Sequence, residues 1–147
     1  MTKSELFDAL FNPRAVALVG ASGDARKNTA RPQRFLQKHD FAGRILPINP
    51  GRDEVLGETS YPDIASAPGP VDHAMIMVPG SAVPGVIEDC RRAGVKIATI
   101  YSDGFAEAGA DGLRRQADMV AQAKDAGLRL IGPNSMGVID THSGSVI

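Results

Sequence analysis

Three short apolar runs, each nearly unbroken, constrain the fold of this chain more than any other feature. They cover residues 15–19, 73–78 and 95–101, and a glycine or proline stands directly beside each run. Continuous apolar runs of this length are typical of strands that are covered on both faces, which is the pattern of a parallel sheet. The sequence therefore predicts a buried sheet with short, sharply ended strands.

Two weaker patterns predict further strands, at residues 44–48 and 128–131. Because Pro47 lacks the N–H that a ladder needs, we place the first of these towards an edge of the sheet, or with an irregular start. Helical patterns fill the gaps at 30–39, 82–93 and 110–126, and a short opening helix with Leu6, Leu10 and Phe11 is expected to pack on the sheet. Strand and helix alternate about five times, which predicts an α/β fold with a doubly wound parallel sheet, Rossmann-like in class.

The helical segments carry their own boundary and packing signals. In 82–93 the apolar residues follow a 3–4 spacing, with Ser81 expected as N-cap and Gly94 just past the end. In 110–126 the apolar positions are Leu113, Ala117, Val120, Ala121 and Ala123, and Gly127 closes the segment. These positions are expected to form the buried faces of the two helices.

Length and charge narrow the class of protein. The 147 residues suit a single domain over 1–147, with 43% hydrophobic and 22% charged residues, as in globular proteins. A net charge of −1 gives no electrostatic case for nucleic acid or an anionic membrane as partner. The one cysteine excludes an internal disulfide, and there is neither a leader-like start nor a long apolar run, so we expect a cytoplasmic protein.

Ligands of doubly wound sheets bind beyond the carboxyl ends of the strands, at the point where the strand order reverses. This rule selects the loops at 20–29, 49–57, 79–81, 101–107 and 132–137. The turn Gly20-Ala21-Ser22-Gly23 follows the first strand directly, so its backbone can approach a phosphate, with Lys27 one turn further on. The simpler interpretation is a tight turn that only reverses the chain.

The turn departs from the dinucleotide fingerprint G-x-G-x-x-G, because Leu18 occupies the first glycine position. The second strand ends in Asn49-Pro50-Gly51-Arg52, where NAD-binding domains usually carry an acidic residue for the ribose. A cationic tip suits an additional phosphate on the ribose. The residues thus disfavour NAD and leave two ligands open, NADP and coenzyme A (CoA).

An ordered set of motifs resembles the CoA-binding domain of NDP-forming acyl-CoA synthetases, which are relatives of the succinyl-CoA synthetase α-subunit. The longest are FNPRAVALVGAS at 11–22, GRILPINP at 43–50, GFAEAG at 104–109 and GPNSMG at 132–137. Shorter ones lie between them at 54–57, 61–62, 71–72 and 78–79. The resemblance spans roughly residues 11–140 and implies a Rossmann-like fold with CoA or acyl-CoA as ligand.

The resemblance also implies the residues that line the site. Those facing the CoA phosphates are Gly20, Ser22, Gly23, Asp24 and Lys27. The region of the adenosine 3′-phosphate is bordered by Asn49, Pro50 and Arg52, and the nucleotide slot by Val78 and Pro79. The pantetheine path is lined by Tyr101, Ser102 and Asp103, and the thiol end by Pro133, Asn134 and Ser135. Many relatives have Gly at the position of Thr29, Gly at Asp40 and Cys at Ser135.

In that family a histidine of a second domain carries the phosphate, and an ATP-grasp part supplies it. His39, His73 and His142 match no such position, so the resemblance implies a binding module that works with the remaining ligase domains or a partner subunit. The apolar ending slightly favours a truncated enzyme over a stand-alone protein. Two alternatives stay open: an NADP-dependent oxidoreductase domain, and a stand-alone CoA-responsive regulatory module.

Several other residues admit a chemical and a structural interpretation. Cys90 lies on the apolar side of a helix and is expected to be a buried, inert thiol. His73 replaces an apolar residue, so that strand end is expected to be partly exposed. Asp140 and His142 are too few ligands for a metal site. Glu107 is expected either to cap the following helix or to orient a loop at the ligand.

Overall fold

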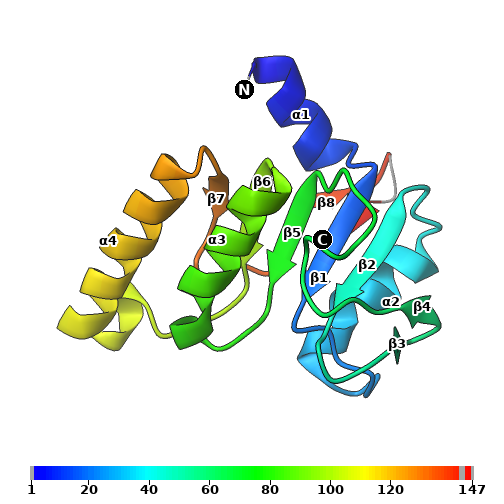
Figure 1. Cartoon of the computed structure of the whole chain (residues 1–147), viewed down its shortest axis with the longest axis horizontal. Helices are drawn as coiled ribbons and strands as arrows, with labels where there is room; N and C mark the ends of the chain where they lie inside the picture. Colours follow the sequence, from blue (N-terminus) through cyan, green and yellow to red (C-terminus); the bar gives the residue numbers. More distant parts are fainter. Residues whose placement is uncertain (1, 143–144, 147) are drawn as a thin grey trace.

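The computed structural model of the chain describes residues 2–142 and 145–146 and contains one central five-stranded parallel sheet (Figure 1). Its strands are β1 (Ala15–Val19), β2 (Arg44–Ile48), β5 (His73–Ile76), β6 (Ile97–Ile100) and β7 (Arg129–Ile131), in the order β2-β1-β5-β6-β7. All five predicted strands are present, although β5 and β6 are shorter than their apolar runs. β2 is an edge strand, as the absence of an N–H on Pro47 predicts.

The register fixes which strand ends meet. Val19 pairs with Ile48 of β2 on one side and with Ile76 of β5 on the other, so β1, β2 and β5 end at the same level. Ile76 in turn pairs with Ile100 of β6. The chain leaves β1 for β2 and then returns to the other side of β1 at β5, which places the reversal of strand order between β1 and β5.

Helices cover both faces of the sheet, as Figure 1 shows. α2 (Arg31–Lys38) lies on one face, where Leu36 packs on Val16, Leu18 and Met75. α3 (Val83–Ala93) and α4 (Ala110–Asp125) lie on the other, and their buried residues join the larger apolar core of the strands. α1 (Lys3–Phe11) stands beyond the amino ends of the strands and buries only Ala9, with Leu6, Leu10 and Phe11 half-buried.

Short elements complete the chain. Two antiparallel pairs are formed by β3 (Glu54–Val55) with β4 (Glu58–Thr59), and by β8 (Ile139–Asp140) with β9 (Ser145–Val146). Three single turns of 3₁₀ helix are η1 (Asn28–Ala30), η2 (Gly80–Ala82) and η3 (Ala106–Ala108). η1 and η2 each precede a helix, so α2 begins at Arg31 and α3 at Val83.

Two predictions about the helices are wrong. Ser81 is not the N-cap of α3, because it lies within η2, and Ala82 precedes the helix without a side-chain cap. The buried residues of α4 are Gly112, Met119 and Ala123, whereas Leu113, Ala117, Val120 and Ala121 are exposed. The apolar spacing thus located the helix but assigned most of its core to the wrong face. Gly94 and Gly127 follow the two helices in left-handed conformations, as predicted.

Candidate functional site at the carboxyl ends of the strands

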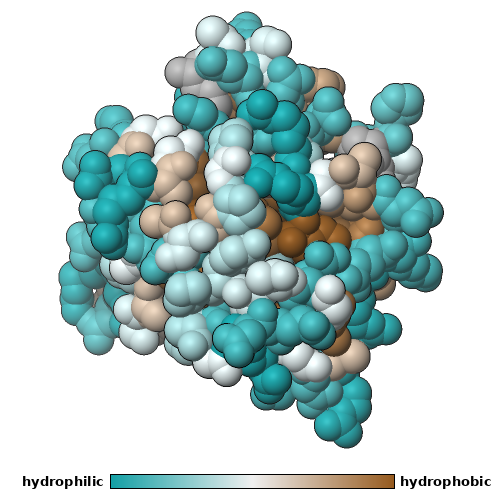
Figure 2. Space-filling view, turned by 45° about the vertical axis from the view of Figure 1, so that its right-hand side comes forward, coloured by the Kyte–Doolittle hydropathy of each residue, from teal (hydrophilic) through white to brown (hydrophobic). Residues whose placement is uncertain are grey.

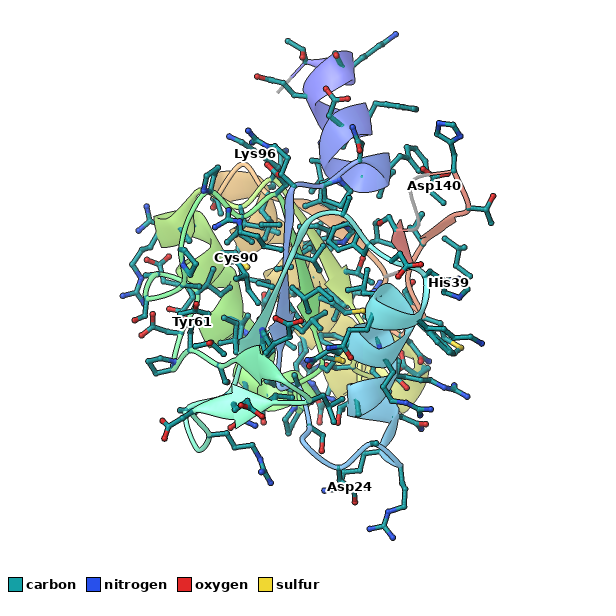
Figure 3. The ribbon with its side chains drawn as sticks, turned by 90° about the vertical axis from the view of Figure 1, so that its right-hand side faces the viewer. Asp24, His39, Tyr61, Cys90, Lys96 and Asp140 are labelled. Atoms are coloured by element: carbon teal, nitrogen blue, oxygen red, sulfur yellow. The ribbon has the colours of Figure 1, made fainter. Side chains whose placement is uncertain are left out.

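The predicted site residues come from five loops that leave the carboxyl ends of the strands. In Figure 3 the loop that carries Asp24 lies at one end of the sheet and Lys96 at the opposite end. The loops after β1 and β5 flank the reversal of strand order, which is the usual ligand position in such sheets. The five loops form a site with two parts. One is the glycine-rich turn together with the tip of β2, and the other is a cleft between β5, β6 and β7.

The glycine-rich turn is packed tightly against the end of β5. Gly20 has a left-handed backbone (φ +86°) and donates from its N–H to the Ile48 carbonyl at 2.9 Å. A Cβ at this position would lie 3.1 Å from Cγ1 of Val78 and 3.2 Å from the carbonyl carbon of Met77. Glycine is therefore needed at Gly20 for both its conformation and the space. The turn reaches α2 through η1, so a helix N-terminus does not follow it directly.

Asp24 supplies the only carboxylate of the predicted phosphate turn, and its charge is paired. Arg26 donates to it from Nε at 3.0 Å, from Nη2 at 3.0 Å and from its backbone N–H at 3.1 Å. The side-chain bonds from Arg26, followed by the backbone bond, lower the pKa of Asp24. Asp24 itself donates its N–H to Ser22 Oγ at 3.1 Å. The carboxylate thus shapes the turn while its repulsion of a phosphate is offset by Arg26.

Asn49 and Arg52 join the tip of β2 to this turn. The Asn49 side chain donates from Nδ2 to the Ala21 carbonyl at 2.9 Å and accepts from the Gly51 N–H at 3.0 Å. The Arg52 guanidinium lies over Gly23, where a Cβ would be 3.1 Å from Nη1 and 3.2 Å from Cζ. The structure therefore brings together the two segments that are predicted to contact phosphates, and it places a guanidinium above the turn. Lys27 and Pro50 are exposed beside them.

A cleft of about 500 Å³ lies between the ends of β5, β6 and β7. Seven predicted site residues line it, namely Val78, Pro79, Tyr101, Ser102, Asp103, Asn134 and Ser135. Pro133 precedes two of these residues but does not line the cleft. Asn28, Met77 and Met136 also line it and were not predicted, although each directly follows or precedes a predicted residue or motif. Asn28 comes from the loop after β1, so the cleft opens next to the glycine-rich turn.

Ser102 fixes the walls of the cleft relative to each other. Its Oγ donates to the carbonyl of Val78 at the end of β5, and its own carbonyl accepts from the Asn134 N–H at 3.0 Å. The next residue, Ser135, donates its N–H to the Ile100 carbonyl at 3.1 Å. Three strand ends are thereby linked through one buried serine. The cleft is consequently a preformed feature of the sheet.

Glu107 orients a loop and does not cap α4. Its Oε1 accepts from the N–H groups of Gly104 at 2.7 Å and Phe105 at 3.1 Å, and backbone hydrogen bonds lower its pKa. Arg115 of α4 donates to the Gly104 carbonyl from Nη2 at 2.6 Å. The loop that follows Asp103 is therefore held on both sides, which is the second of the two roles expected for Glu107.

The buried nucleophile and histidine lie away from this site. Cys90 is fully buried on α3, where burial raises the pKa of its thiol to about 12 (Figure 3), as expected of an inert core residue. The expectation that His73 is partly exposed is wrong, because it is fully buried with Nε2 2.8 Å from Thr99 Oγ1. Burial lowers its pKa to about 4, so His73 is neutral at pH 7. Its neighbour Asp72 is paired with Arg14 at 3.0 Å instead.

A second hollow, of about 590 Å³, runs along the outer edge of β2 between α2 and the 58–68 segment. Figure 2 shows apolar side chains at its floor. None of the predicted site residues lines it, and it lies beside a strand, not at the strand ends. We therefore place the ligand site where the five loops converge and not in the hollow beside β2, although that hollow is the larger of the two. Within the described ranges, no helix is long and apolar enough to cross a membrane.

Comparisons with known proteins agree with this geometry. A family model described as a CoA binding domain matches residues 14–141. The chain is 39% identical over 93% of its length to acetate–CoA ligase [ADP-forming] II of Archaeoglobus fulgidus. It is 36% identical over 94% of its length to the α-subunit of acetate–CoA ligase [ADP-forming] II of Pyrococcus furiosus. It spans 20% and 30%, respectively, of the lengths of these two proteins.

A solved structure shows the same fold. The dinucleotide-forming acetyl-coenzyme A synthetase 1 of Ca. Korarchaeum cryptofilum, in its apo form, superposes with a TM-score of 0.89 at 40% identity. The superposition covers 94% of this chain and 30% of that one. Together with the match over 14–141, these findings show that the chain belongs to the CoA-binding domain family found in ADP-forming acyl-CoA synthetases, with coenzyme A as its ligand.

Proposed function

We propose that the chain binds CoA across the reversal of strand order, as the CoA-binding domain of an NDP-forming acyl-CoA synthetase. The phosphates lie on the glycine-rich turn and the pantetheine arm enters the cleft between β5, β6 and β7. The main observation in support of this arrangement is that the Arg52 guanidinium lies over Gly23, because this places a cation where the tip of β2 meets the turn. A bent, polyanionic ligand with an apolar arm fits both parts.

The phosphate half of the proposed site uses few side chains. Ser22 Oγ and the Gly23 N–H supply donors, and Lys27 adds charge from an exposed position. The Gly20 N–H is already bonded to the Ile48 carbonyl, so Gly20 contributes by letting the turn pack closely on the end of β5. Asn49 and Pro50 border the 3′-phosphate, and Asn49 also holds the turn through the Ala21 carbonyl. Arg52 is the residue most directly available to that phosphate, since a guanidinium binds phosphate oxygens in pairs. Asp24, already paired with Arg26, acts by holding the turn.

The pantetheine half is formed by the cleft. Val78, Pro79 and Tyr101 supply apolar surface, and Ser102 and Asp103 border the path. Pro133, Asn134 and Ser135 stand at the far end, where the thiol would emerge. The buried position of Ser102 and its bonds to two neighbouring strand ends keep the path open before the ligand arrives.

The chemistry of the whole enzyme requires groups that we place outside this chain. We propose that the domain presents the CoA thiol to an acyl phosphate, which further ligase domains or a partner subunit would form from ATP. His73 does not suit a phosphate carrier, because it is fully buried and faces Thr99. The same proposal places the protein in the cytoplasm and gives it no nucleic-acid partner, in keeping with its near-neutral charge.

Calorimetric titration tests this function and the role of Arg52. At low salt we expect CoA to bind the folded chain, and Arg52→Ala to weaken binding by about 5- to 30-fold, as for loss of one charge-assisted contact. Arg129→Ala, which removes an exposed arginine at the start of β7, is the matched control and should bind normally. Dephospho-CoA should bind the unchanged chain and Arg52→Ala alike. Absence of CoA binding by a folded sample would reject the function, and an equal loss in both variants would reject the role of Arg52.

The two alternative functions are separated by simple measurements. An NADP-binding domain would bind NADPH in preference to CoA in the same titration, whereas the family match supports CoA. A stand-alone CoA-responsive module stays a prediction from the sequence. A native reading frame that stops after Ile147 would favour it, and a frame that continues would remove it.

A further inference from the structure

An apolar stripe of α4 is left uncovered by the fold. Leu113 and Val120 are 59% and 50% exposed, and Ala117 and Ala121 between them are exposed as well. At 100° per residue, the four side chains occupy roughly 100° of the helix circumference. The buried side chains of α4 point in a mean direction about 130° away from the stripe around the helix axis. The helix therefore has two apolar faces, and the described chain uses one of them.

The uncovered stripe points away from the rest of the molecule. α3 lies on the opposite flank of α4, where Gln122 donates to the Pro84 carbonyl at 2.8 Å. β7 is the last strand of the sheet, and Figure 1 shows α4 as the outermost helix beside it. Within residues 2–142 and 145–146, no helix or strand lies beyond this edge. A partner can therefore reach the stripe without moving any described element.

We infer that this stripe binds the same stripe of a second copy of the chain, with the two α4 helices antiparallel about a twofold axis at Ala117. In that arrangement residue i faces residue 234 − i of the other copy. The large Leu113 then meets the small Ala121, and Val120, on the same flank as Leu113, lies beside Leu113 of the other copy. Ala117 lies at the axis, where a small side chain lets two helices approach closely. The stripe is thus complementary in shape to itself, as an isologous interface requires.

The charges beside the stripe are also self-complementary. Arg114 and Asp118 lie on one flank of α4, and in an antiparallel pair the same flanks of the two helices face each other. Arg114 of one copy then comes within reach of Asp118 of the other. Arg114 is already paired with Asp111, whereas Asp118 has no ion pair within the described part of the chain. The dimer would give each Asp118 a cationic partner, and these two contacts offset the repulsion between the two Asp118 side chains, which face each other beside the axis.

The size of the surface sets the strength of the association. A 16-residue helix is roughly 24 Å long, and the stripe covers about half of it, so the buried area is smaller than in a standard stable dimer. We therefore expect a weak dimer whose fraction rises with protein concentration. The cleft and the glycine-rich turn do not contain stripe residues, so CoA binding is expected to be the same in monomer and dimer.

Sedimentation velocity over a wide range of concentrations tests the dimer. We expect the weight-average mass of the unchanged chain to rise towards twice the monomer mass, and Val120→Glu to remain monomeric with an unchanged circular dichroism spectrum. Lys38→Gln, on α2, also lowers the net charge by one at an exposed position and should not alter the association. A chain that is monomeric throughout, or a dimer that persists in Val120→Glu, overturns the proposal. The first result would assign the stripe to a different polypeptide partner.

Cysteine cross-linking gives a second test, which can trap a weak dimer as a covalent one. The single native thiol, Cys90, is buried, so Ala117→Cys introduces one reactive thiol at the twofold axis. Mild oxidation should convert it to a covalent dimer. Asp125→Cys, on the same helix, would lie roughly 24 Å from its own copy and should remain monomeric. Equal cross-linking of both variants, or of neither, would contradict the antiparallel arrangement.

Discussion

Replacing Gly20 by alanine tests whether the phosphate turn and the cleft form one rigid unit. Gly20 and Gly57 have nearly identical φ angles, +86° and +85°. A left-handed backbone costs an alanine about 1–2 kcal/mol at either position. At Gly57 the new Cβ meets nothing within 4 Å, whereas at Gly20 it meets Val78 at 3.1 Å and the backbone of Met77 at 3.2 Å. Overpacking of this kind adds about 1–3 kcal/mol.

Urea unfolding of the two variants measures the difference. We expect Gly20→Ala to lower the free energy of unfolding by about 2–5 kcal/mol and Gly57→Ala by about 1–2 kcal/mol, with unchanged m-values. CoA affinity should fall only in Gly20→Ala, because only that change displaces the turn. If both variants lost the same stability, the close packing of the turn on β5 would be refuted, and with it the rigid junction of the two halves of the site.

Three further predictions concern the helices, the cleft and the core. Gly112→Ala, whose Cβ would overlap the Phe105 carbonyl oxygen, should lower the free energy of unfolding by more than about 2 kcal/mol. Gly85→Ala, at the same third position of α3 but in open space, should raise it by up to about 1 kcal/mol, and thermal unfolding measures both changes. Ser102→Ala should weaken CoA binding by about 2- to 10-fold in calorimetry, because it removes the hydrogen bond to the Val78 carbonyl. Ser66→Ala, which removes an exposed hydroxyl, should bind CoA normally, and equal affinities of the two variants would exclude a role of Ser102 in positioning the cleft. The pKa of His73 is about 4 in the folded chain and 6.5 for a free side chain, so between these values the unfolded chain binds more protons. The free energy of unfolding therefore falls as the pH drops from about 6.5 to 4, by on the order of 3 kcal/mol. His73→Gln should remove most of this pH dependence between pH 7 and 5, and an unchanged slope would contradict a neutral buried His73.

The sheet could be predicted from sequence because its strands are buried on both faces. β1 consists of five fully buried residues, so its pattern depends on the sheet alone and not on any one neighbour. The position of β2 at an edge could be predicted for a different reason, because Pro47 has no N–H for a neighbouring strand. Loop positions follow from the strand ends, which is why seven predicted residues line one cleft.

The errors arise where tertiary contacts decide between equivalent local patterns. α4 has two apolar faces, and periodicity cannot say which one the sheet covers. His73 is polar by composition, yet Thr99 on the adjacent strand gives it a buried partner that only the register of β5 and β6 supplies. The position of Arg52 over Gly23 depends likewise on how the turn after β2 folds back, through Asn49, onto the turn after β1.

A crystal structure of the chain with CoA bound would show directly where each part of the ligand lies. The proposed binding mode places the diphosphate on the Gly20–Gly23 turn, the 3′-phosphate beside Arg52, and the pantetheine arm in the cleft between β5, β6 and β7 with its thiol near Ser135. CoA in the hollow along the outer edge of β2, or with its phosphates away from the glycine-rich turn, would contradict it.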